Sequence, residues 1–205
     1  EKHPTTPEDQ STGVLGGIGQ LAGQAGRTLH ELLAETTLIV HGTTTADNTM
    51  IEMSGATTGL VTSDGHRDEI EIRRGYKEDI WDPALPPPRP ICPRRRRYGV
   101  PERLDYEGAV VVPLDEAGVR RACRRLQRQG VRSHAAVFLF SYVNPAHEQR
   151  VREIAAEELP GAMISLSHQV MPSAPEFERT STTLVNPYVG PKIGRYLSWL
   201  EGRVG

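Results

Sequence analysis

The stretch Thr37-Thr-Leu-Ile-Val-His-Gly-Thr-Thr-Thr-Ala-Asp-Asn-Thr-Met-Ile51 decides how the chain is interpreted. Leu38–Val40 is a short apolar run that predicts a buried strand. Gly42 ends this strand, and Thr43–Thr45 place three hydroxyls where a helix over 46–52 begins. A strand end that leads into a Thr-rich helix start offers hydroxyls, unpaired N–H groups and a positive dipole end. The stretch therefore predicts an anion or phosphate site.

A structural explanation of the same threonines stays open. One Thr hydroxyl can cap the helix by accepting a hydrogen bond from a backbone N–H, while the others face solvent. Thr-rich caps are common, so this stretch alone favours the cap over a ligand site.

Composition narrows the class of protein. The 205 residues are 37% hydrophobic and 5% aromatic, with a formal charge of −2, which excludes a disordered, fibrous or nucleic-acid-binding chain. Apolar runs such as 135–140 are too short to span a bilayer, so no membrane partner is expected. Cys92 and Cys123 form no disulfide framework or zinc spacing, which indicates a reducing, cytoplasmic location. The chain opens on Glu1 without Met or a signal sequence, so we expect a piece of a longer protein.

Alternating strand and helix patterns predict an α/β fold with crossover helices. We expect a first α/β part over 1–72, an excursion over 73–107 and a second α/β part over 108–205. The expected strands are 57–62, 109–112, 134–140 and 163–166. The expected helices are two pieces within 12–34, a short one at 66–70, one from the Asp115 cap to Gly130, one at 144–159, and one at 177–200 that Pro187 and Pro191 break or kink.

The excursion is rich in proline and arginine. Residues 73–105 hold seven prolines and the run Arg94–Arg97, with little periodicity, so we expect an ordered loop rather than core. A basic run is usually a solvated loop or a subunit contact. No ladder of aromatic residues flanks it, so we expect no nucleic-acid partner.

Histidines and nucleophiles give no catalytic centre. The seven histidines show no paired metal-ligand spacing, so no metal site is expected within the chain alone. We expect His134 to be a hydrogen-bonded structural residue in a strand and His147 to lie on the exposed side of a helix. No phosphate-binding P-loop and no nucleophile elbow is present, and the catalytic residues stay unassigned.

A second polar cluster, Phe177–Thr183, lies at the head of the long C-terminal helix. It places Glu178 and Arg179 beside four hydroxyl residues. A capping box with exposed threonines explains the same pattern, and taken alone the cap is favoured.

Several motifs in order resemble those of the hydantoinase A, 5-oxoprolinase and acetone/acetophenone carboxylase family, from about Pro4 to Leu200. Each motif is weak alone, and their order and spacing carry the resemblance. They are His41-Gly-Thr-Thr44 with Asn48, Gly65-His-Arg-Asp68, Pro101-Glu-Arg103, Pro113-Leu-Asp115, Gly130-Val131, Ser141-Tyr-Val-Asn-Pro-Ala-His-Glu148 and Glu178-Arg-Thr-Ser-Thr-Thr183.

The resemblance implies the N-terminal lobe of an actin-like ATPase fold, with a mixed sheet. It implies ATP and a divalent cation such as Mg²⁺, both held with residues outside this chain, so the isolated chain should be inactive. The implied activity is ATP-dependent hydrolysis of a cyclic amide. ATP-dependent carboxylation of a ketone is the alternative, and a non-catalytic assembly subunit is a third. The implied partners are the rest of the parent chain, a hydantoinase B-type subunit and further copies in a homo- or hetero-oligomer.

The resemblance also assigns residues to a site. Gly42, Thr43 and Thr44 would face the γ-phosphate or the phosphorylated substrate, and Asn48 would add an amide contact. Arg179, Thr180 and Ser181 would form a second wall.

Overall fold

The computed structural model describes residues 3–4, 10–75 and 77–204. The chain forms two compact units. One consists of Glu1–Glu52 with Lys192–Gly205, and the other of Met53–Pro191. We call them the terminal unit and the sheet unit, and each is described by itself.

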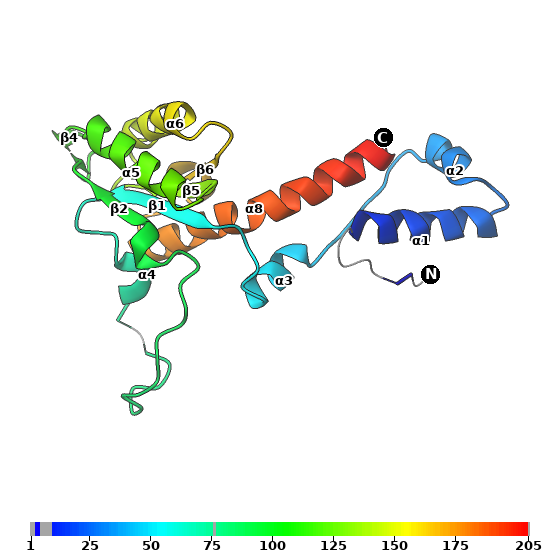
Figure 1. Ribbon diagram of the computed structural model, residues 1–205, viewed down its shortest axis with the longest axis horizontal. Helices are drawn as coiled ribbons and strands as arrows, with labels where there is room; N and C mark the ends of the chain where they lie inside the picture. Colours follow the sequence, from blue (N-terminus) through cyan, green and yellow to red (C-terminus); the bar gives the residue numbers. More distant parts are fainter. Residues whose placement is uncertain (1–2, 5–9, 76, 205) are drawn as a thin grey trace. The chain divides into compact units, whose positions relative to one another are not determined.

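The sheet unit is built on four parallel strands in the order β2-β1-β5-β6 (Figure 1). Thr58 pairs with Ser133, and Leu60 pairs with Arg97. The four described strands are β1 (Thr58–Ser63), β2 (Arg97–Val100), β5 (Ser133–Val137) and β6 (Met163–Leu166). Three of them match strands expected from the sequence, which confirms the α/β class.

Both faces of this sheet are covered by helices. Figure 1 shows α5 and α6 on one face and the first part of α8 on the other. Val61 and Ala136 point to the first face, while Leu60 and Ala135 point to the second, as alternation along a strand requires. The helices of this unit are α4 (Glu69–Ile72), η1 (Arg94–Arg96), α5 (Glu116–Arg128), α6 (Ala146–Glu158), α7 (Ser167–Val170) and the first part of α8 (Glu176–Val204).

A single mixed sheet was expected, but the antiparallel strands form a separate two-stranded sheet. β3 (Arg103–Leu104) pairs with β4 (Val110–Val112), and neither strand joins the four-stranded sheet. All three strand pairings within the four-stranded sheet are parallel. The apolar run at 109–112 is therefore a strand, as expected, but its three valines are exposed.

The long helix α8 continues through both of its prolines. The sequence predicted a break or kink at Pro187 and Pro191, and the helix is not broken at either. Pro191 has no N–H to donate to the carbonyl of Pro187. The Ser133 hydroxyl of β5 donates to that carbonyl instead, so the sheet satisfies the acceptor that the proline leaves unpaired.

The described part of the terminal unit contains the helices α1, α2 and α3 and the end of α8. Thr28 caps α2 in a capping box with Glu31, whose carboxylate accepts from the Thr28 N–H at 2.8 Å. The helices are α1 (Gln10–Gln24), α2 (Leu29–Glu35) and α3 (Thr45–Ile51). The two helical pieces predicted within 12–34 are confirmed, with Gly26 in the left-handed region at φ 68° between them.

The predicted strand at Leu38–Val40 is wrong. These residues form no strand and are exposed, Val40 to 87%. A strand needs a neighbour to accept and donate its backbone hydrogen bonds. In the described chain no strand of either sheet pairs with this run.

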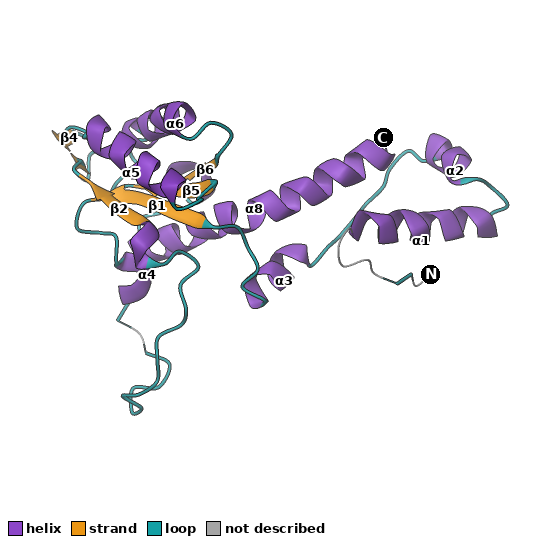
Figure 2. Cartoon of the chain, viewed as in Figure 1, coloured by secondary structure: helices purple, strands orange, loops and turns teal. Residues whose placement is uncertain are grey.

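The predicted excursion is also partly wrong. Figure 2 shows a long loop before β2, and residues 77–91 form it. The second half of the predicted excursion is part of the folded core. It contains β2, the edge strand of the four-stranded sheet, and Cys92, Val100 and Leu104 are buried. Arg97 holds this segment against the core, because its side chain is fully buried. It donates to the Cys92 carbonyl at 2.7 Å and to the Glu71 carboxylate at 2.7 Å.

His134 departs from its prediction in one respect. It lies buried in β5 as expected, but neither ring nitrogen has a hydrogen-bond partner in the described part of the chain. Burial lowers the pKa of His134 to about 4, so the ring is neutral at pH 7.

No helix among residues 3–4, 10–75 and 77–204 has the length and apolar character needed to cross a bilayer.

Arg97 should contribute far more stability than its neighbour Arg95. Arg97→Met leaves the Cys92 carbonyl without its partner inside the core and removes a fully buried guanidinium that pairs with the exposed Glu71 carboxylate, which costs about 1–3 kcal/mol of unfolding free energy. Arg95→Met changes an exposed side chain and should cost under ~0.5 kcal/mol. Urea denaturation of both variants measures the difference, and equal losses would contradict this account of β2.

His134 should make the protein less stable in acid. The unfolded state takes up a proton below pH 6.5, whereas the folded state resists it until about pH 4. The free energy of unfolding therefore falls as the pH drops from 6.5 to 4, by up to ~3 kcal/mol from this residue. His134→Leu should flatten the slope in that window. His30→Gln, at an exposed position, is the control and should leave the slope unchanged.

Candidate functional site

The carboxyl edge of the parallel sheet gathers buried polar side chains. β1 ends at Ser63 and β6 at Leu166, and the residues that follow the strands lie at one edge because all four strands run the same way. Ligands of α/β sheets bind outside this edge. A ligand site of the sheet unit is therefore expected at this edge.

Glu148, in the first turn of α6, is the centre of one buried cluster. Its Oε1 accepts from the Phe138 N–H at 3.0 Å and from the Ser167 hydroxyl at 2.5 Å. Its Oε2 accepts from the His168 N–H at 3.1 Å and lies 2.7 Å from His168 Nδ1. The carboxylate thus joins the residues that follow β5 to those that follow β6, and four donors compensate its burial.

Glu102 is the centre of a second cluster, beyond the end of β2. The Ser63 hydroxyl donates to Oε1, and His147 Nδ1 lies 2.8 Å from Oε2. Ser63 Oγ also accepts from the Leu139 N–H at 3.0 Å. The Ser63 hydroxyl donates to a carboxylate and not to an imidazole, so Ser63 does not form the serine–histidine pair of a nucleophilic site.

His147 was predicted on the exposed side of α6, and that prediction is wrong. The residue is 8% exposed. It lies one position before Glu148, in the turn of α6 that faces the ends of the strands, so its ring is directed to Glu102 rather than to water.

Arg179 of α8 lies buried below the same edge. It donates to the carbonyls of Phe138 and Ser173 at 3.0 Å each, and its guanidinium lies 5.1 Å from the centre of the Tyr142 ring. Burial lowers the pKa of Arg179, but a guanidinium stays charged at neutral pH. Its Nε has no partner among the described residues. In this structure the side chain therefore fixes the backbone after β5.

The threonine cluster lies in the terminal unit and lines a cavity of ≈ 540 Å³. The Thr43 hydroxyl accepts from the Thr45 N–H at 3.2 Å, so Thr43 supplies the cap. Thr44 occupies the N-cap position but makes no side-chain cap bond, and its hydroxyl lies 3.5 Å from Asn48 Nδ2. Tyr196 closes one side through a 2.5 Å contact between its hydroxyl and His41 Nε2.

The structure brings four of the seven predicted site residues together. Gly42, Thr43, Thr44 and Asn48 all line the cavity of the terminal unit. The other three belong to the sheet unit, where Arg179 and Thr180 are buried and Ser181 is half-buried.

Glu102 and Glu148 were not identified as site residues from the sequence. Both occurred in motifs of the family resemblance, at Pro101-Glu-Arg103 and in Ser141–Glu148. An acidic residue just after an apolar strand, or in the first turn of the following helix, is the signal that would have indicated the carboxyl edge.

The cysteines have no nucleophilic character. Burial raises the pKa of the Cys92 thiol to about 12 and that of Cys123 to about 11. Among the residues that the structure describes, no three or more His, Cys, Asp or Glu side chains are arranged to hold a metal ion.

Comparisons with known proteins identify related chains. Residues 1–159 match the family described as hydantoinase/oxoprolinase N-terminal region. Caprolactamase subunit alpha of Pseudomonas jessenii is 39% identical over 202 residues, covering 98% of this chain and 29% of the relative. The acetophenone carboxylase gamma subunit of Aromatoleum aromaticum is 37% identical, covering 92% and 28%. 5-Oxoprolinase 1 of Arabidopsis thaliana is 29% identical, covering 77% and 14%.

Two solved structures share the fold. The crystal structure of an ATP-dependent caprolactamase from Pseudomonas jessenii superposes with a TM-score of 0.91 at 38% identity, covering all of this chain and 30% of that one. A nucleotide-free acetone carboxylase superposes with a TM-score of 0.88 at 28% identity, covering 98% and 30%. The chain therefore spans less than a third of the length of these relatives.

The pairing of Glu102 with His147 should contribute measurably to the free energy of unfolding. His147→Phe keeps a ring of similar size but leaves the buried carboxylate with Ser63 alone, which should cost about 3 kcal/mol. His147→Gln retains an N–H donor and should lose less than half of that. Urea denaturation tests the pair of variants, and equal small losses in both would show that the histidine does not compensate Glu102.

Proposed function

The chain belongs to the hydantoinase/oxoprolinase family, as its N-terminal region, and on this premise we propose that it forms part of an ATP-dependent enzyme that opens a cyclic amide. The observation that carries the proposal is the similarity to caprolactamase, at 39% identity in sequence and a TM-score of 0.91 in structure. The fold supports the N-terminal lobe of an actin-like ATPase.

A ketone carboxylase is the second candidate. The acetophenone carboxylase gamma subunit is 37% identical, only slightly less similar than the caprolactamase subunit, and acetone carboxylase shares the fold. Both candidates use ATP to activate an otherwise unreactive substrate. The common part of the proposal is therefore ATP-dependent activation, and the substrate separates the two.

The cavity of the terminal unit suits the phosphate end of ATP in part. Thr43 and Thr44 offer hydroxyls, Asn48 offers an amide, and Gly42 leaves its backbone accessible because no atom lies within 4 Å of where a Cβ would be. ATP would supply the phosphoryl group. Among the described lining residues there is no Asp, Glu, Lys or Arg, so ligands for a divalent cation and charges for the phosphates must come from elsewhere.

Residues of the sheet unit are proposed to act at the same reaction. Thr180 and Ser181 would add hydroxyls, while Arg179 would act as a positive charge below the carboxyl edge. The proposal also includes a second catalytic subunit as partner, since the relatives are named as subunits. Use of ATP and two free cysteines agree with a cytoplasmic enzyme.

Substrate-dependent ATP hydrolysis tests the proposal on the full-length protein with its partner subunit. We expect phosphate release to rise with caprolactam, hydantoin or 5-oxoproline, together with opening of the ring. Release that depends on acetone or acetophenone and on bicarbonate would instead support the carboxylase. No ATP hydrolysis with any of these substrates would contradict both candidates.

Substitution of Thr43 and Thr44 distinguishes a phosphate-binding role of the threonine cluster from a helix-capping role. If a hydroxyl contacts developing phosphate charge, Thr→Ala lowers turnover about a hundredfold, or ~3 kcal/mol of barrier. Loss of a cap alone costs about 1 kcal/mol of stability. Thr43→Ala and Thr44→Ala should therefore reduce turnover sharply in at least one variant while the melting temperature falls by only a few degrees. Thr182→Ala, at an exposed position, is the control. Normal turnover in both variants would show that the threonine cluster only caps α3 and would contradict the phosphate site.

A further inference from the structure

A basic pocket lies at the edge of the sheet opposite the carboxyl edge. Its volume is ≈ 290 Å³, and all of its described lining residues belong to the sheet unit. Thr57 precedes β1, and Arg95 and Arg96 precede β2, so the pocket lies at the amino ends of two neighbouring strands. It is distinct from both clusters of the carboxyl edge and from the threonine cavity.

The four consecutive arginines divide into two pairs by their partners. Arg94 donates to both carboxylate oxygens of Asp68, at 2.9 and 3.0 Å, and Arg97 binds Glu71. The inner pair, Arg95 and Arg96, lines the pocket. The outer charges of the run are therefore neutralised within the fold, and the inner charges are directed to a cavity.

The pocket concentrates positive charge without a counter-ion from the protein. Arg89, Arg95 and Arg96 line it, and none of its described lining residues is Asp or Glu. Among the described residues, the Arg96 side chain donates to the Thr58 carbonyl, at 3.5 Å. Burial lowers the pKa of Arg96, and the charge of Arg95 acts in the same direction. Three like charges around one small space favour an anion between them.

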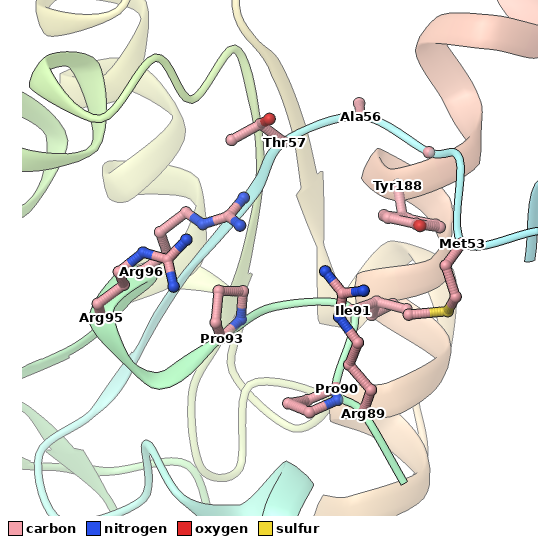
Figure 3. Close-up of a pocket in the computed structure, with 11 residues that line it drawn as sticks. Met53, Ala56, Thr57, Arg89, Pro90, Ile91, Pro93, Arg95, Arg96 and Tyr188 are labelled. Atoms are coloured by element: carbon pink, nitrogen blue, oxygen red, sulfur yellow. The ribbon is translucent and has the colours of Figure 1, made fainter.

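The opposite wall of the pocket is apolar. Figure 3 shows the Arg89 guanidinium between Pro93 on one side and Met53 and Tyr188 on the other, with Arg95 and Arg96 beyond Pro93. A Cβ at Gly55 would lie 2.4 Å from the Tyr188 ring, so the glycine allows the ring to lie against the backbone. The Ala56 N–H donates to the Tyr188 carbonyl at 2.8 Å and holds this wall in place.

We propose that this pocket binds a small organic dianion, with its phosphate or carboxylate groups on Arg89, Arg95 and Arg96 and its apolar body against Met53 and Tyr188. Guanidinium groups recognise both kinds of oxyanion through paired N–H donors. A volume of ≈ 290 Å³ is at the lower limit of ligand pockets and suits a molecule of a single ring or short chain. The proposal does not depend on the enzymatic function proposed above.

Calorimetric titration of the full-length protein tests the pocket with phenyl phosphate, phthalate and inorganic phosphate. We expect saturable binding of phenyl phosphate or phthalate, about tenfold tighter than inorganic phosphate because the ring is buried against the apolar wall. If phenyl phosphate binds more tightly than phthalate, the ligand is a phosphate, and the reverse order indicates a dicarboxylate. Either order supports the site.

The variants Arg89→Gln and Arg95→Gln test whether the probes bind in this pocket. Within the described chain, the side chains of Arg89 and Arg95 make no hydrogen bond or ion pair, so these variants should fold with an unchanged melting temperature. Each should weaken binding about tenfold or more. Arg103→Gln removes the same charge from β3, outside the pocket, and is the matched control. No saturation by about 10 mM of any probe, or equal weakening in all three variants, would overturn the proposal.

Discussion

The sheet unit depends on one buried carboxylate. Where parallel strands end, their backbone N–H groups lose their partners, and a buried N–H without a partner costs free energy. Glu148 accepts from the Phe138 N–H after β5 and from the His168 N–H after β6. It thereby ends two strands at once, and β5 stops at Val137 although the apolar run continues to Phe140. Glu102 has a related role where it binds Ser63, the last residue of β1.

The two edges of the sheet have opposite electrostatic character. Carboxylates paired with histidines lie at the carboxyl edge, and arginines without acidic partners line the pocket at the amino edge. The outer arginines of the same run, Arg94 and Arg97, pair instead with Asp68 and Glu71. This division gives the sheet unit two chemically different ends, and the threonine cavity of the terminal unit offers further hydroxyls to a phosphate.

Local patterns in the sequence predicted much of the fold. Asp115 was expected to cap a helix that Gly130 ends, and Asp115 accepts from the Gly118 N–H at 2.9 Å while Gly130 has φ 70°. Long-range contacts decided the failures. Leu38–Val40 was predicted to be a buried strand, but no strand of the described chain pairs with it. Arg97 was predicted to lie in a solvated loop, whereas its side chain is buried and donates to Glu71 and to the Cys92 carbonyl. Of the predicted site, the threonine cluster was local and its residues do share a cavity. Glu102 and Glu148 were missed because their partners are distant in sequence.

A double-mutant cycle between Glu148 and Ser167 tests the central claim most directly. The variants are Glu148→Gln, Ser167→Ala and the double variant, each measured by urea denaturation. If Glu148 joins the ends of β5 and β6, the two positions are coupled by about 1.5 kcal/mol or more, as expected for a buried hydrogen bond to a charged group. Free-energy losses that add within ~0.5 kcal/mol would show that the carboxylate does not hold the strand ends together.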